Sequence, residues 1–190
     1  MKNISKDILA AAAEGDVSAF SQIYQAASLF VYNTALRITF NREDAQEITQ
    51  DVFLKIYNQL RNFRFGSSFK TWLYRITVNT ALNAVKRRAK RIRGQIEYKD
   101  EVALSVRYQK EIETTEQTYN AQLVQSMLGS LNEKQRVCII LREFEEMSYQ
   151  EMAETLKINI NTVRSRLKRA RQALLRMVKN KERLQCSVEK

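Results

Sequence analysis

The stretch at residues 148–171 constrains the fold of this chain more than any other, because two short helical patterns meet in it at a polar corner. Ser148 precedes Glu151 by three residues, which predicts a capping box at the start of the first helix. The apolar residues at helical spacing are Met152, Ala153 and Leu156 in the first helix and Val163, Leu167, Ala170 and Leu174 in the second. Asn161 or Thr162 can cap the second helix through a side-chain oxygen. The pattern predicts a helix-turn-helix.

The other face of the second predicted helix indicates what the motif binds. This face has no acidic residue and carries Arg164, Ser165, Arg166, Lys168, Arg169 and Arg171. Arginine and lysine contact guanine edges and phosphates, and serine can contact either kind of base edge. A face that is only solvated usually mixes both signs of charge. The pattern therefore favours DNA binding over a solvated helix in a basic protein.

The composition of the whole chain fits an all-α protein. Its 190 residues include no proline and four glycines, whereas strand-rich folds need many turn residues. The hydrophobic share of 44% suffices for real cores, and the net charge of +11 indicates an anionic partner. We expect two small helical domains at residues 1–93 and 116–190. Between them, residues 94–115 alternate in charge without an apolar face, which predicts a linker.

Some kinds of site are disfavoured by what the chain lacks. Histidine is absent, which removes His-based acid–base catalysis and most zinc sites. The two cysteines form no CxxC motif, and Cys138 lies in an apolar run where burial is expected. A signal-peptide pattern and an apolar run of about 18 residues are both missing. Together with a reduced compartment for the cysteines, this predicts a cytoplasmic protein.

Four helices are expected in the N-terminal half. They cover residues 5–14, a stretch from Asp16 or Ser18 to residue 38, a stretch from the cap Asn41 to residue 60, and a stretch from Ser67 or Ser68 to residue 88. The third of these helices has an apolar side, which includes Tyr57. Its other side is polar without being strongly basic and carries Glu47, Gln50, Asp51, Lys55 and Asn58. Such a face suits either solvent or a protein partner.

An aromatic loop precedes the fourth helix. Residues 62–70 hold three aromatics, two cations and a glycine, and residues 86–93 add six cations. Phe63, Phe69 and Trp72 can be core residues, and for Trp72 we expect the core, whereas Phe65 is the better candidate for exposure. Aromatics beside cations also hold unstacked bases, and clustered cations contact phosphates. This half therefore suits single-stranded DNA, while the helix-turn-helix suits duplex, a pairing that can open DNA at a defined place.

The C-terminal half shows two further patterns beside the helix-turn-helix. Residues 131–144 predict one helix with Phe144 turned inward, and residues 180–190 predict a frayed tail.

Taken together, these stretches resemble bacterial RNA polymerase sigma factors of the extracytoplasmic-function (ECF) group. DAQEITQDVFLKIY at residues 44–57 resembles the region-two helix that docks on the polymerase β′ clamp helices. FRFGSSFKTWLYRITVNTALN at residues 63–83 resembles the −10 loop and recognition helix, and residues 131–171 resemble region four, which reads the −35 element. The pieces TWLYRI and TVRSRLKRAR are specific. Two departures are Asn132, where the family often has proline, and residues 145–147, where it often has glycine.

The resemblance implies three sets of site residues. The set for the −35 element is Thr162, Arg164, Ser165, Arg166, Lys168, Arg169 and Arg171. The set for the −10 element is Phe63, Arg64, Phe65, Ser67, Ser68, Lys70, Arg75, Asn79, Asn83, Arg87 and Arg88. The set for docking on polymerase is Asp44, Glu47, Gln50, Asp51, Lys55 and Asn58. The implied partners are core RNA polymerase through its β′ clamp helices and β flap, promoter DNA, and an anti-sigma factor that can hold the protein at the inner face of the membrane. The resemblance implies no catalytic residue, metal, cofactor or small-molecule substrate.

Two other classes of protein compete with this interpretation. A nuclease or recombinase needs an activated nucleophile or a carboxylate metal cluster. The densest acids, Asp44, Glu47 and Asp51, lie on one predicted helix without a second acidic cluster in sequence to face them, which favours a solvated or docking face. A repressor or activator that binds duplex alone has no need of the aromatic loop.

Overall fold

The chain forms two helical units. The computed structural model describes residues 4–63, 68–96 and 116–188, and the side chains of residues 4–63, 68–91 and 122–179. Contacts divide the chain into Met1–Arg107 and Tyr108–Lys190, and the dividing point falls inside the segment 94–115 that we predicted as the linker. All regular structure in the described ranges is helical, which confirms the all-α prediction.

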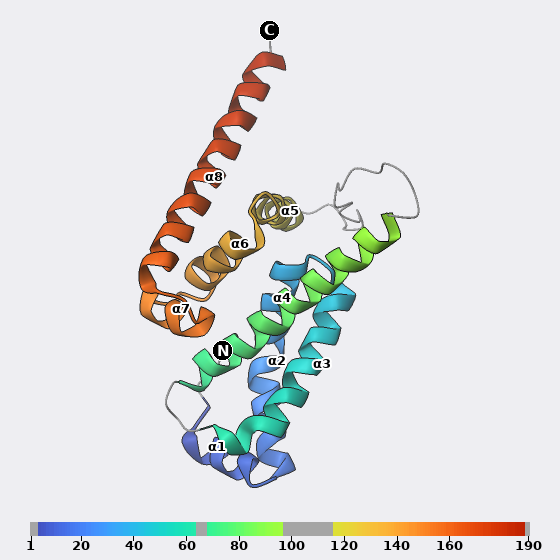
Figure 1. Cartoon of the computed structure of the whole chain (residues 1–190), viewed down its shortest axis with the longest axis vertical. Coiled ribbons are helices and arrows are strands. Elements are labelled where there is room, and N and C mark those ends of the chain that lie inside the picture. Colours follow the sequence, from blue (N-terminus) through green and yellow to red (C-terminus); the bar gives the residue numbers. More distant parts are fainter. Residues whose placement is uncertain (1–3, 64–67, 97–115, 189–190) are drawn as a thin grey trace. The chain divides into compact units, whose positions relative to one another are not determined.

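The N-terminal unit is built around three long helices. Its elements are α1 (Lys6–Ala13), α2 (Val17–Thr39), α3 (Arg42–Gln59), the short 3₁₀ helix η1 (Leu60–Asn62) and α4 (Phe69–Ile96). Helices α2, α3 and α4 pack against one another, and α1 packs on α2 (Figure 1). Their shared core includes Ile23, Val31, Ile56 and Leu73, all of which are fully buried. This packing brings the polar sides of α3 and α4 next to each other.

Side-chain caps begin the first three helices, and Asn41 caps the third as the sequence predicts. The Ser5 hydroxyl accepts from Ile8 N–H, and the Asp16 carboxylate accepts from Ser18 N–H at 2.7 Å. The Asn41 side chain accepts from Asp44 N–H at 2.7 Å. Each cap satisfies a backbone N–H that has no partner inside its helix. Gly15 joins α1 to α2 at φ 103°, a conformation that favours glycine.

Tyr57, on the predicted apolar side of α3, lies at the edge of the core and not inside it. Its side chain is 51% exposed and its ring packs edge-on against Phe20, with centroids 5.1 Å apart. On α3 the core positions are already filled by Val52, Phe53 and Ile56. Tyr57 therefore rests on the rim of the core, with room for its hydroxyl in solvent.

The C-terminal unit holds the helix-turn-helix. Its elements are α5 (Glu116–Gly129), α6 (Glu133–Ile139), the π-helical turn η2 (Ile140–Phe144), α7 (Tyr149–Leu156) and α8 (Ile160–Val188). Helices α6 and α7 both pack on α8. Asn132 accepts from Gln135 N–H and so caps α6, which shows that a cap replaces the proline frequent in the family.

The single helix predicted over residues 131–144 is interrupted. It changes from α to π at Ile140, and the turn closes with Glu145 N–H donating to Ile140 O at 3.3 Å. The wider turn keeps Ile140 and Leu141 buried but leaves Phe144 37% exposed, so the inward placement of Phe144 is wrong. Beyond it, Glu146 adopts φ 56°, a left-handed conformation of the kind that glycine takes easily. Glu146 lies in the stretch where the family often has glycine.

Two predictions about α8 are also wrong. Its cap is Asn159, whose side chain accepts from Asn161 N–H at 2.8 Å, so neither Asn161 nor Thr162 caps the helix. The corner contains two asparagines at i and i+2, and spacing alone does not distinguish them. Residues 180–188, predicted as part of a frayed tail, continue the helix to Val188.

Candidate nucleic-acid interface

The turn of the helix-turn-helix is fixed by local hydrogen bonds. Ser148 and Glu151 form the predicted capping box at the start of α7. Lys157 ends α7 in the left-handed conformation, and its N–H donates to the carbonyls of Ala153 and Glu154. The Arg142 guanidinium donates to Met147 O at 2.7 Å and lies over the Tyr149 ring, which ties η2 to the start of α7. These contacts fix both ends of α7, the helix that precedes α8 in the motif.

Helix α8 buries one stripe and presents cations on the other side. Val163, Leu167 and Ala170 are buried as predicted. The predicted DNA-binding residues that are exposed are Arg164, Ser165, Lys168, Arg169 and Arg171. Thr162 is half-buried, and its carbonyl accepts from the Ser165 hydroxyl at 3.0 Å. The Arg164 guanidinium donates to the Asn161 side chain at 3.1 Å, which holds it beside the start of the helix.

Two of the predicted cations are engaged inside the unit. Arg166 is half-buried and hydrogen bonds to the buried thiol of Cys138 on α6. Burial raises the pKa of the Cys138 thiol, and the charge and hydrogen bond of Arg166 offset part of that rise. Arg171 forms an ion pair with Glu143 at 2.8 Å. Both arginines therefore tie α8 to the α6–η2 segment, a role that the sequence did not reveal.

The aromatic residues beside α4 form a packed cluster. Phe69 and Trp72 are each 7% exposed, which confirms the expectation for Trp72. The ring of half-buried Phe63 packs against that of Trp72, with centroids 5.0 Å apart and planes tilted by 35°. The Ser68 hydroxyl accepts from Thr71 N–H at 3.0 Å and so serves the start of α4. Arg64, Phe65 and Ser67, predicted to contact the −10 element, lie outside the described residues.

Along α4, polar and cationic side chains continue from this cluster. Exposed Asn79 and Asn83 follow half-buried Arg75 at intervals of four residues, so all three lie on one face. Lys70 is exposed and its ammonium lies 5.8 Å from the Tyr74 ring centroid. Arg87 and Arg88 are exposed near the other end of the face.

The residues predicted to dock on polymerase divide into two stripes of α3. The outward stripe contains the exposed residues Glu47, Gln50 and Asn58. Leu54 lies in the same stripe and is 62% exposed, although it is not among the residues predicted to dock on polymerase. Its signal in the sequence is a leucine that falls out of phase with the buried positions Val52 and Ile56.

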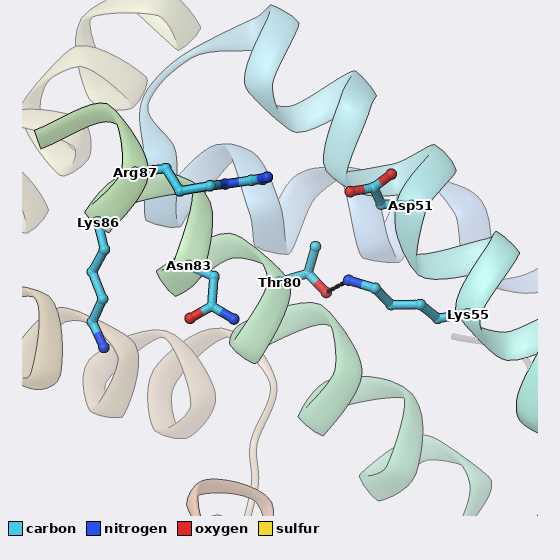
Figure 2. A pocket seen from close by; sticks show the side chains of 6 residues that line it. All are labelled: Asp51, Lys55, Thr80, Asn83, Lys86 and Arg87. Atoms are coloured by element: carbon cyan, nitrogen blue, oxygen red, sulfur yellow. Dashed lines mark hydrogen bonds between the residues drawn. The ribbon is translucent and has the colours of Figure 1, made fainter. Parts of the chain in front are cut away.

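The second stripe of α3 faces α4. Half-buried Asp44 forms an ion pair with Arg88 at 3.0 Å, and the Lys55 ammonium donates to the Thr80 hydroxyl at 2.9 Å. Asp51 is half-buried and lies opposite Arg87 (Figure 2). The fold thus brings residues of α3 that were predicted to dock on polymerase next to residues of α4 that were predicted to bind the −10 element.

We call the line along which the second stripe of α3 meets α4 the seam. An open cleft of about 420 Å³ lies along the seam. Its lining residues are Asp51, Lys55, Thr80, Asn83, Lys86 and Arg87 (Figure 2). Across the described side chains there is no group of three or more acids or cysteines placed to hold a metal ion. None of the described helices is long and apolar enough to cross a membrane.

Comparison with known proteins assigns both units. Residues 23–91 match the family model of sigma-70 region 2, and residues 121–174 match that of sigma-70, region 4. The chain is 33% identical over 174 residues to the RNA polymerase sigma-H factor of Pseudomonas aeruginosa, spanning 84% of this chain and 86% of that protein. It is 32% identical over 174 residues to the ECF RNA polymerase sigma-E factor of Haemophilus influenzae, spanning 88% and 89%.

A solved structure shares the fold. The sigma factor RpoE from Bartonella quintana, in complex with the anti-sigma factor NepR, aligns with a TM-score of 0.66 at 23% identity. The alignment covers 86% of this chain and 98% of that chain.

Proposed function

Because the chain belongs to the ECF group of sigma-70-type RNA polymerase sigma factors, it is a promoter-recognising subunit of RNA polymerase, and we propose how its two units divide that work. The observation that carries the proposal is that each unit has its own polar, cationic surface, on α4 in one and on α8 in the other. Two surfaces, one on each unit, suit two promoter elements.

The C-terminal unit reads the −35 element with α8. Ser165, Lys168 and Arg169 are exposed side by side on the helix and contact base edges in the major groove. Arg164 and Thr162, near the helix start, contact the flanking phosphates. Arg166 and Arg171 support this surface mainly through their bonds to Cys138 and Glu143.

The N-terminal unit binds the −10 element and helps to melt it. Bases that leave the duplex re-pair unless they are held, and stacking on an aromatic contributes about 1–3 kcal/mol per base. The packed cluster of Phe63, Phe69 and Trp72 gives the start of α4 a rigid base. Arg75, Asn79 and Asn83 then line the path of the separated strand. In the proposal, Arg64, Phe65 and Ser67 also contact the −10 element.

Helix α3 docks on the β′ clamp helices through its outward stripe. Interfaces gain most of their affinity from a few buried apolar or aromatic anchors within a polar rim. Leu54, exposed between Gln50 and Asn58, fits the anchor, and Glu47 belongs to the rim. The C-terminal unit meets the β flap.

An anti-sigma factor is a further partner in the proposal. The related RpoE from Bartonella quintana has been solved with one. This chain works where RNA polymerase is, in the cytoplasm, and an anti-sigma factor can hold it at the inner face of the membrane. Bond making belongs to the polymerase, so we assign this chain no catalytic residue, cofactor or small-molecule substrate.

Reconstitution with core polymerase tests the proposal. The purified chain is mixed with core enzyme and genomic DNA, and the 5′ ends of the RNAs are sequenced. We expect start sites that share one sequence near −35 and another near −10, and that are absent with core enzyme alone. Core enzyme that gains no new start sites would count against a promoter-recognising role.

A further inference from the structure

Lys55 lies on the stripe of α3 that faces α4. Although the side chain is exposed, its ammonium donates to the Thr80 hydroxyl of α4 at 2.9 Å, so it reaches across the seam (Figure 2). Thr80 is 4% exposed and belongs to the turn of α4 between Asn79 and Asn83. A lysine in this position adds a positive charge to the surface of α4 and not to the outward stripe of α3.

The cations of the cleft have no carboxylate partner in the described parts of the chain. Lys55 is held by a neutral hydroxyl. The ion pairs among the described side chains are those of Arg88 with Asp44 and of Arg171 with Glu143, so neither Lys86 nor Arg87 is paired with a described acid. Arg88, the next residue along α4, is by contrast paired with Asp44 at 3.0 Å. Asp51 is the one carboxylate in the cleft lining, against three cations. The cleft therefore carries a net positive charge, which can bind an anion.

We propose that the cleft between α3 and α4 binds a phosphate of the promoter DNA backbone, and that Lys55 is a DNA contact from the polymerase-docking helix. This proposal rests on the proposed function. Within that function it assigns Lys55 to the DNA and not to docking on polymerase. Lys55 and Arg87 reach the cleft from opposite helices, with Lys86 at its edge, so one phosphate can be approached from two sides. Thr80 and Asn83 add uncharged polar groups, which suit the remaining phosphate oxygens.

The cleft suits a phosphate better than an acidic protein side chain. It opens beside Asn79 and Asn83, the exposed polar face of α4, whereas the outward stripe with Leu54 lies on another side of α3. A strand that follows the asparagine face passes the cleft on the way to Arg87. Docking on a protein would use the outward stripe and leave the cleft open.

The test uses holoenzyme assembled from the full chain and core polymerase, with a promoter fragment as the probe. Lys55→Gln removes the charge, and its DNA affinity is measured from 0.1 M to 1 M salt. Loss of one phosphate contact lowers the slope of log affinity against log salt by about 0.7 for a single strand and about 0.9 for duplex. At 0.1 M salt this corresponds to binding that is about five- to eightfold weaker. Lys55→Arg, which keeps the charge, should retain most of the affinity.

Controls separate the possible outcomes. Lys6→Gln removes an exposed charge from α1 and should leave the salt slope unchanged. Core affinity of the Lys55→Gln chain should equal that of the unmodified chain. Weaker core binding with an unchanged salt slope would overturn the proposal and return Lys55 to the docking surface. Unchanged values in both assays would also overturn it. Failure of the proposed function is distinct, because the unmodified holoenzyme would then show no promoter preference.

Discussion

The two cationic surfaces of this protein are constructed differently. In the C-terminal unit a single helix, α8, buries Val163 and Leu167 on one side and exposes Lys168 and Arg169 on the other. In the N-terminal unit the surface forms where two helices meet, and its charges are partly matched across the seam, as in the 3.0 Å pair of Arg88 with Asp44. A surface on one helix can be inferred from the sequence, because the positions of the apolar residues define the buried face and therefore also the exposed face. A surface shared by two helices also depends on how they pack.

The largest expected effect tests whether the two units are independent. Leu167 is 1% exposed, and Leu167→Ala should destabilise the C-terminal unit by about 2–5 kcal/mol, because it leaves a cavity in the core. Trp72, the single tryptophan, lies in the N-terminal unit, so its fluorescence during urea unfolding should not change. In circular dichroism, the part of the helix signal that comes from the C-terminal unit should be lost at a lower urea concentration.

Leu175→Ala is the matched control for this experiment. It makes the same change on the same helix at a side chain that is 60% exposed, and it should alter stability by less than about 0.5 kcal/mol. A tryptophan transition that moves together with the helix signal in Leu167→Ala would mean that the units unfold as one, and the comparison between them would lose its basis.

The next effect concerns the face of α8. Arg169→Ala should weaken holoenzyme binding to its promoter by about 1–3 kcal/mol and relax the preference at one −35 position, because an exposed arginine can make two hydrogen bonds to guanine. Selection from a library of randomised −35 sequences measures the preference. Arg164→Ala serves as control, since a phosphate contact should weaken all sequences alike. A preference unchanged by Arg169→Ala would refute the base-reading role.

The smallest effect concerns the seam of the N-terminal unit. Asp44→Asn removes the ion pair with Arg88, whose side chains are 31% and 47% exposed, so stability should fall by less than about 1 kcal/mol. DNA binding should hold or strengthen slightly, because Arg88 keeps its charge and loses its carboxylate. Thermal unfolding and the salt dependence of promoter binding measure the two quantities.

Glu43→Gln controls for the charge at the start of α3. Glu43 is an exposed acid in the same helical turn, so it shares the interaction with the helix dipole but not the pair with Arg88. If Asp44→Asn weakens DNA binding while Glu43→Gln does not, the ion pair with Asp44 positions Arg88 for the DNA. Arg88 would then resemble Arg166 and Arg171 of α8, which are held by bonds within their own unit.

By itself the sequence determined the helical class, most of the caps, and the two faces of α8. These features depend on contacts within about four residues, so spacing and side-chain chemistry specify them. The exceptions are local ambiguities: Asn159 caps α8 although Asn161 has the same side chain two residues later, and the π turn at Ile140 shifts Phe144 outward.

Only the tertiary structure decided how the charges of the N-terminal unit are used. The spacing of Asp44, Asp51 and Lys55 puts them on one stripe of α3, but α4 reaches that stripe from residues 25 to 44 positions away. Leu54 lies on the outward stripe of α3, together with Glu47, Gln50 and Asn58, which were predicted to dock on polymerase. Whether a stripe meets solvent, a partner or another helix depends on the packing of α2, α3 and α4. Periodicity within one helix carries no information about that packing, because it fixes relative directions around the axis and not the neighbour that each direction meets.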